Sequence, residues 1–173
     1  MLNYALPFGQ SAQGAHAALV KGWQVNAIVV SESGQPFTVT NSSPLSNTGI
    51  GSDRPNQLSD PNNGGSSGLP IHTLSRWFNT GAFAGQTLGT IGTERRNMLW
   101  GPPFRHFDPS VSKDFALGER MNLQARVEAF NVTNTPNFGL PGSVFPSATF
   151  GVINSTRTNS TPRQIQGSLR LSF

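Results

Sequence analysis

The sequence predicts an all-β protein, an antiparallel up-and-down meander of about five strands with two long loops. The first observation is that apolar and polar residues alternate with a period of two in five stretches, as in strands with two unlike faces. The second is the composition, with 19 glycines and 13 prolines among 173 residues and only 12% charged residues. The third is that the connections between the stretches alternate between short and long. These features favour strands joined by turn-rich loops over helices.

The five strands are expected near residues 1–8, 20–40, 104–116, 120–132 and 162–173. The apolar residues of each strand share one parity, and in chain order they are Leu2, Tyr4, Leu6 and Phe8; Trp23, Val25, Ala27, Val29, Phe37 and Val39; Phe107, Val111 and Phe115; Met121, Leu123, Ala125, Val127 and Ala129; Ile165, Leu169, Leu171 and Phe173. The second strand is the least regular, because Ile28 and Val30 fall among its polar positions.

The connections between these strands differ sharply in length. Residues 9–20 form a modest link and residues 117–119 a tight turn, whereas residues 42–103 and 133–161 are long loops rich in Gly, Ser, Asn and Pro. Outer-membrane barrels alternate short periplasmic turns with long extracellular loops. If the C-terminus lies on the periplasmic side, both long loops are expected to be extracellular.

Alternation alone also fits a soluble β-sandwich, which turns its apolar faces inward. A membrane barrel turns them outward to lipid and lines its lumen with polar side chains. The polar rows are rich in Gln, Ser and Asn, with Arg near Asp or Glu, which suits an enclosed polar space where hydrogen bonds must be completed. Asp108 and Arg126, on adjacent strands of the short hairpin, are predicted to form a polar pair in the lumen. The barrel is therefore the preferred interpretation.

Aromatic residues support the same interpretation. Phe8, Trp23, Phe115 and Phe173 all fall at the expected periplasmic strand ends and on the apolar parity. They are predicted to form one row of an interfacial aromatic girdle. Lys113 is the exception on the apolar parity, and its ammonium is expected to reach up to the periplasmic headgroups.

Other function classes have little support in the sequence. The net charge of +4 comes with no basic cluster beyond Arg95 and Arg96, so no nucleic-acid partner is expected. Cysteine is absent, the three histidines are far apart, and no carboxylate pair is placed for acid–base catalysis. No catalytic residue, metal or cofactor is expected, and no enzymatic activity. No apolar run reaches the roughly 18 residues of a membrane-spanning helix.

The chain resembles the C-terminal barrel segment of a TonB-dependent receptor of the Oar-like (carboxypeptidase-regulatory-like domain-containing) subgroup. The likeness is carried, in order along the chain, by LPFG (6–9), GWQVNAI (22–28), SGQPFTV (33–39), DRPN (53–56), RWFNTGAFA (76–84), GTERRNMLWGPPFRHFDPSVSKDF (92–115), RVEAFNVTNTPNFG (126–139), FGVINSTR (150–157) and PRQIQGSLRLSF (162–173). The resemblance implies the outer membrane of a Gram-negative bacterium. It also implies that Leu169, Leu171 and Phe173 form the signal read by the barrel-assembly machinery.

Such receptors close with about 22 strands around a plug, whereas five strands are predicted here. The resemblance therefore implies a fragment that forms barrel wall and extracellular loops for ligand uptake and does not function alone. Its partners would be outer-membrane lipid, the barrel-assembly machinery, and the upstream barrel and plug of the full-length receptor. The inner-membrane TonB motor would be contacted only through the missing N-terminal part, because no signal peptide, plug or energy-coupling box is recognisable in the sequence.

Ligand contacts are expected in the first long loop. Trp77 and Trp100 occur there with Arg76, Arg95 and Arg96, and aromatic and arginine groups suit a carbohydrate, peptide or anionic ligand. The alternative is that these aromatic residues only pack the loop against the barrel rim. The alternative to the whole assignment is a small soluble or surface-attached β-rich binding module.

Overall fold

The computed structural model describes residues 1–8, 13–49, 51–64, 68–118 and 120–173. The chain folds as two compact units whose segments alternate along the sequence. The first, here called the sheet unit, comprises Met1–Glu32, Arg105–Pro136 and Thr161–Phe173. The second, here called the loop unit, comprises Ser33–Phe104 and Asn137–Ser160.

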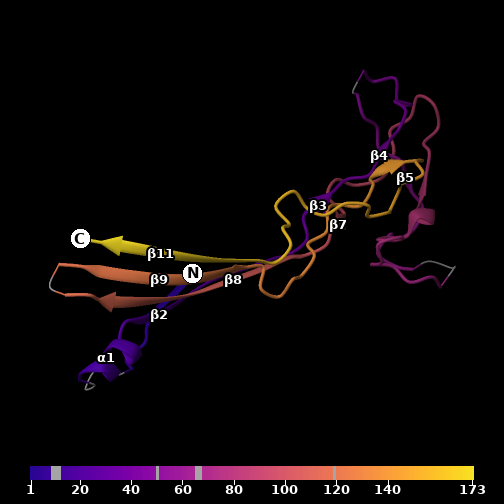
Figure 1. Cartoon of the computed structure of the whole chain (residues 1–173). Coiled ribbons are helices and arrows are strands. Elements are labelled where there is room, and N and C mark those ends of the chain that lie inside the picture. The colour runs from indigo at the N-terminus through magenta and orange to yellow at the C-terminus, as the bar shows by residue number, and fades with distance from the viewer. Residues whose placement is uncertain (9–12, 50, 65–67, 119) are drawn as a thin grey trace. The chain divides into compact units, whose positions relative to one another are not determined.

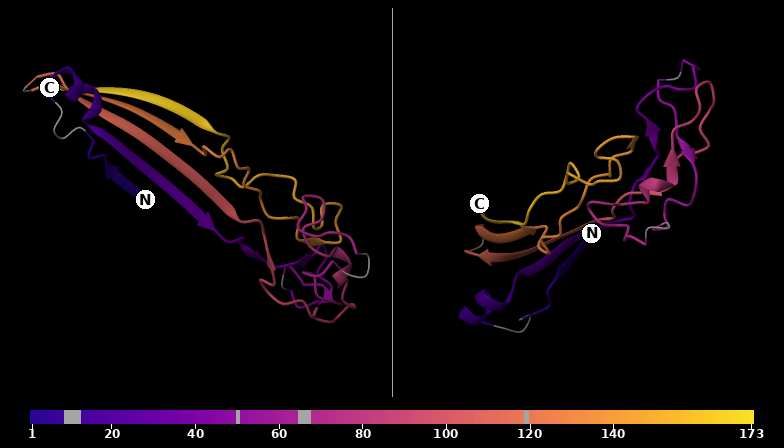
Figure 2. Two further views of the ribbon diagram at one scale, coloured as in Figure 1. Left: turned by 90° about the horizontal axis from the view of Figure 1, so that it is seen from below. Right: turned by 90° about the vertical axis from the view of Figure 1, so that its right-hand side faces the viewer.

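The sheet unit is built on one five-stranded sheet, whose long strands lie side by side in Figures 1 and 2. In spatial order the strands are β1 (Leu2–Ala5), β2 (Trp23–Glu32), β8 (Phe104–Ala116), β9 (Asn122–Phe130) and β11 (Gln164–Ser172). The pairings β1–β2, β8–β9 and β9–β11 are antiparallel. The prediction of an antiparallel sheet of five strands is thus confirmed.

The second strand is shorter than predicted. β2 ends at Glu32, and the stretch that follows enters the loop unit, so the strand expected over residues 20–40 is wrong beyond residue 32. Gly34 lies so close to the backbone of Gly101 that an added Cβ would stand 1.8 Å from its carbonyl oxygen. Phe37 and Val39, predicted to face lipid, are instead buried in the core of the loop unit.

A short helix occupies part of the predicted link before β2. The helix α1 (Ala15–Val20) has six residues and is followed by Gly22, whose φ is +78°. A side chain at Gly22 would also meet the carbonyl oxygen of Asp114 at 2.5 Å, so glycine is needed where the chain turns into the sheet. In the part of the chain that is described, no helix has the length and apolar character to cross a bilayer.

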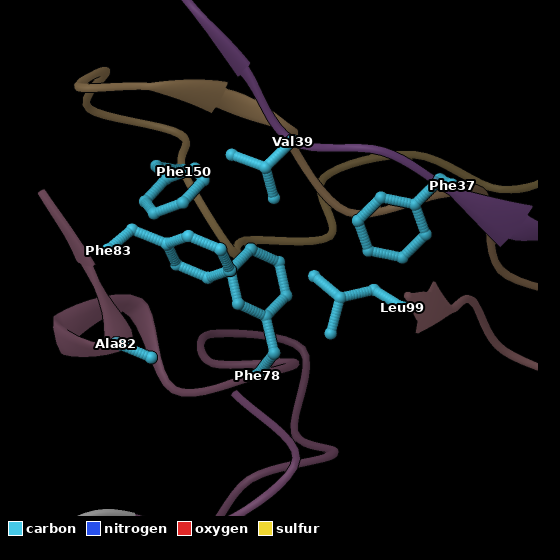
Figure 3. Packing of buried hydrophobic residues seen from close by; sticks show 7 residues of the cluster. All are labelled: Phe37, Val39, Phe78, Ala82, Phe83, Leu99 and Phe150. Carbon is cyan, nitrogen blue, oxygen red and sulfur yellow. The ribbon is translucent and has the colours of Figure 1, made fainter. Parts of the chain in front are cut away.

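The two long loops build the loop unit together. Its pairings are short: β3 (Pro36–Phe37) with β7 (Leu99–Trp100), β4 (Thr40–Asn41) with β10 (Val144–Phe145), and β5 (Asn56–Gln57) with β6 (Phe83–Ala84), which follows the 3-10 turn η1 (Thr80–Ala82). Its core, drawn in Figure 3, consists of Phe37, Val39, Phe78, Ala82, Phe83, Leu99 and Phe150. The Phe78 ring lies 5.1 Å from that of Phe150, which comes from the second loop. The two loops therefore share one core.

Candidate functional site

The sheet has one apolar face, because apolar residues stand opposite one another on neighbouring strands. The cross-strand pairs on this face include Tyr4 with Val25, Val111 with Val127, Phe115 with Leu123, Ala125 with Leu169, and Ala129 with Ile165. Much of this face is open, since the exposed fractions of Val127 and Leu169 are 55% and 75%. An apolar surface continuous across five strands marks a contact with lipid or protein rather than water.

The opposite face is polar and bonded across strands. The amides of Gln24 on β2 and Gln124 on β9 both donate to the carboxylate of Asp114 on β8, at 3.4 and 2.9 Å. Further along, the Gln166 amide on β11 donates to Glu128 on β9 at 2.6 Å. These bonds link four neighbouring strands, as expected of a polar wall whose groups need partners.

A cavity of about 300 Å³ lies on this polar face. Its polar lining residues come from four of the strands and are Asn3, Gln24, Asn26, Asp108, Ser110, Ser112, Gln124, Arg126 and Glu128. Ile28, which broke the alternation of its strand in the sequence, also lines it. The described residues include no group of three or more His, Asp or Glu side chains placed to hold a metal ion.

The predicted lumenal polar pair of Asp108 and Arg126 is wrong in its partners, although both residues line the cavity. Arg126 pairs with Glu128 on its own strand at 2.6 Å, and Asp108 lies 3.3 Å from His106 and accepts the Asn131 N–H at 2.8 Å. The strand register explains the difference. Arg126 stands opposite Ser112, four residues from Asp108 along β8, and each residue of a strand advances about 3.3 Å.

The aromatic residues of the predicted girdle lie at one end of the sheet. Trp23 begins β2, and its carbonyl accepts the Leu6 N–H. Phe115 on β8 stands opposite Leu123 on β9, which in turn stands opposite Leu171 on β11, so these positions lie at the same level of the sheet. Phe8 and Phe173, two residues beyond Leu6 and Leu171, are exposed by 58% and 98%. Both long loops leave the sheet from its opposite end. Whether the four rings form a girdle stays a prediction.

The ammonium of Lys113, expected to reach the periplasmic headgroups, is instead bonded within the protein. It belongs to the apolar face, opposite Ala125, yet its exposed fraction is only 6%. Its Nζ lies 4.9 Å from the centre of the Trp23 ring and 4.8 Å from that of Phe115. It donates hydrogen bonds to the carbonyls of Leu19 and Lys21, both at 2.8 Å. The ammonium finds its partners in the backbone at the end of α1 rather than in headgroups.

One protein family, described as an outer membrane beta barrel domain, matches residues 1–166. The chain belongs to this family. No curated protein and no solved structure matches it. The barrel domain is therefore located in the outer membrane and its sheet forms barrel wall, which excludes the soluble β-sandwich. In such a wall the apolar face contacts lipid and the polar face borders the lumen.

The five residues predicted to contact a ligand all lie in the loop unit, but they differ in how far they are engaged in contacts with the protein itself. The guanidinium of Arg76 donates to the carbonyls of Gly64 and Leu69 and to the Asn79 side chain. Trp77 packs against the core and donates from Nε1 to the Trp100 carbonyl at 2.7 Å. These contacts give Arg76 and Trp77 a structural role.

Three predicted ligand residues remain exposed: Trp100 by 54%, and Arg95 and Arg96. Arg95 lines an open hollow of about 340 Å³, together with Gln57, Leu58, Ser59, Thr93 and Met98. Arg76 and Trp77 are only partly exposed, so these three are the more accessible residues of the predicted set.

The barrel domain also holds two buried carboxylates that sequence reasoning missed. Hydrogen bonds from the hydroxyl and backbone N–H of Ser46 lower the pKa of Asp53, which also accepts a bond from Gln86. Burial raises the pKa of Glu94 to about 7, while the Val39 N–H and the charge of Arg54 act in the opposite direction. No local pattern in the sequence marks Glu94 as buried, yet its exposed fraction is 2%.

The loop unit is expected to lose stability as the pH rises through the range set by Glu94. Because its folded pKa of about 7 exceeds the ordinary value of 4.5, the folded state retains a proton that the unfolded chain releases. The stabilisation is fully present below about pH 4.5 and is lost by about pH 7, on the order of 2 kcal/mol after solvent screening. Protease resistance of the loop unit, measured from pH 4 to 8, tests this. Glu94→Gln, which stays neutral, should flatten the profile; an equally steep profile in this variant would contradict the assignment.

Proposed function

We propose that the chain forms part of the barrel wall and the extracellular loops of a TonB-dependent receptor of the Oar-like subgroup, which takes up a ligand across the outer membrane. The observation that carries the proposal is the two-faced sheet, in which most apolar residues stand opposite apolar residues and most polar residues opposite polar ones in the pairings β1–β2, β8–β9 and β9–β11. The family supports the wall, and the resemblance in sequence supports the receptor class. The proposed role involves no catalysis and no nucleic acid.

The sheet needs partners for both of its edge strands. Strands β1 and β11 stand at the two ends of the strand order, and unpaired backbone groups in lipid cost several kcal/mol each. The upstream barrel of a full-length receptor would pair them and surround its plug, through which the TonB motor acts. Leu169, Leu171 and Phe173 lie in or just after the edge strand β11 and outside the matched residues, and we assign them to recognition by the barrel-assembly machinery.

The proposal is tested with the full-length protein. It should require detergent for extraction from the outer-membrane fraction and show heat-modifiable mobility on gels. Growth on candidate carbohydrates, peptides or anionic nutrients should depend on its gene and stop when the inner-membrane motor is removed. Uptake that continues without the motor would contradict a TonB-coupled receptor and leave the barrel wall in place.

Trp100→Ala is expected to weaken ligand binding at least tenfold, whereas Trp77→Ala should mainly loosen the loop unit. The reason is that Trp100 is exposed and Trp77 is packed against the core. Interface tryptophans that contact a ligand commonly contribute about 2 kcal/mol or more. Binding to whole cells gives the affinity, and protease resistance reports folding. Unchanged affinity in Trp100→Ala and in Arg95→Ala, with the loop unit intact, would remove this surface from the ligand site.

A further inference from the structure

The end of helix α1 lies against the apolar face of the sheet. Lys113 projects from that face, since its partner across β9 is Ala125, which is paired with Leu169 on β11. Its ammonium reaches the carbonyls of Leu19 and Lys21 at the C-terminal end of α1. The helix end therefore covers Lys113 on the side of the sheet that contacts lipid.

This contact supplies hydrogen-bond donors to two carbonyls, those of Leu19 and Lys21, at the end of a helix on the apolar side of the sheet. The last carbonyls of a helix have no partner within it, and such groups are costly in contact with hydrocarbon. Leu19 receives two donors, because the Trp23 indole Nε1 also donates to its carbonyl, at 2.9 Å. The positive charge of Lys113 is favourable at a helix C-terminus and over the Trp23 and Phe115 rings.

The outer side of α1 offers an apolar surface beside a cation. Leu19 and Val20 are exposed by 66% and 39%, and Lys21 next to them is exposed. The helix that carries this surface is held through Lys113 at the lipid-facing side of the sheet, at the end with Trp23 and Phe115. Apolar side chains next to an ammonium suit the boundary between acyl chains and phosphate groups.

We propose that α1 is an interfacial segment that inserts Leu19 and Val20 into the headgroup layer of the phospholipid leaflet, with Lys113 as the residue that positions it. The occupant of this surface is phospholipid, because Lys113 holds the helix at the lipid-facing side of the wall that the outer-membrane family places in lipid. The assignment of this leaflet to the periplasmic side rests on the proposed function, whereas the contact with phospholipid rests on the wall alone.

The test uses nitroxide labels on the full-length protein in vesicles of phosphatidylethanolamine and phosphatidylglycerol. This chain contains no cysteine, so Leu19→Cys and Val127→Cys each introduce one labelling site in it. At Leu19 the label is expected to collide more with dissolved oxygen than with a water-soluble nickel chelate, as at Val127. In the protein labelled at Leu19, Lys113→Met should raise the collisions of the label with the chelate several-fold. Lys113→Arg keeps a cation and donors, so the ratio of oxygen to chelate collisions should stay as in the parent protein. Lys21→Arg is the matched control, because it keeps the cation beside Leu19 and Val20, and the bond to Lys113 uses only the backbone carbonyl of residue 21.

Each outcome bears on the inference. A Leu19 label that behaves as in water, while the Val127 label reports lipid, overturns the interfacial helix and leaves the barrel wall intact. Water-like behaviour at both sites overturns the wall as well. A Leu19 label in lipid that Lys113→Met leaves unchanged, in a protein with normal heat-modifiable mobility, removes Lys113 as its positioning residue. If Lys113→Met does not insert, the label in the parent protein still decides where α1 lies.

Discussion

Replacing Val127 by arginine is expected to lower the free energy of unfolding of the inserted barrel by about 2–4 kcal/mol. Val127 lies near the middle of β9 on the lipid-facing row, between Val111 on β8 and Gly167 on β11. Neither neighbour offers a side-chain acceptor, so the guanidinium would lose its hydration without gaining a partner. The cost is largest here because the substitution lies near the bilayer midplane rather than at an interface.

Gln166→Arg provides the matched control on the lumenal row. Gln166 stands opposite Glu128 and already donates to its carboxylate, so an arginine there keeps an acceptor of opposite charge. Its effect should stay within about 0.5 kcal/mol, as for an ordinary surface substitution. Urea unfolding of the full-length protein in lipid vesicles measures both variants. Equal effects at the two positions would contradict the assignment of the two faces.

Phe78→Ala is expected to destabilise the loop unit by about 3–5 kcal/mol. Phe78 is 1% exposed, and its ring lies 5.9 Å from those of Phe37 and Phe83 and 5.1 Å from that of Phe150. Truncation would remove contacts with both loops at once and leave a cavity that short strand pairs cannot close. The loops would then lose their common core.

Hydrogen exchange measures this loss directly. The N–H groups of Thr40 and Trp77, in the first segment of the loop unit (Ser33–Phe104), donate to the carbonyls of Ser143 and Gly151 in its second segment (Asn137–Ser160). Both should exchange much faster in Phe78→Ala. Leu88→Ala is the control, because Leu88 is 69% exposed and its loss should cost less than about 0.5 kcal/mol. Protection that persists in Phe78→Ala would show that the loops are ordered by something other than this cluster.

The strands of the sheet could be predicted because a two-faced wall imposes a period of two on each of them. The same period could not show where β2 ends. Phe37 and Val39 continue the parity of the lipid-facing Val25 and Ala27, although they pack in the core of the loop unit. A buried position in the loop unit and a lipid-facing position in the sheet both favour apolar residues, so the alternation does not distinguish between them. Only Gly34 and Pro36 locally marked the break.

The contacts of the site were predictable only in part. The polar row and its carboxylates followed from parity, but the partners of Arg126 depend on the register between β8 and β9, which no local pattern fixes. Lys113 was recognised as unusual on the apolar row. Its acceptors lie more than 90 residues earlier in the chain, in a helix too short to give a periodic signal.

The core that the two long loops share limits how the sequence of the loop unit can change. The ring of Phe150, from the second long loop, packs against those of Phe78 and Phe83 from the first. Neither loop therefore contains the whole hydrophobic core. A chimera that receives only one of the two loops from a relative would combine aromatic side chains that do not pack well against one another. Recombination that exchanges the loop unit between relatives should therefore carry both long loops together.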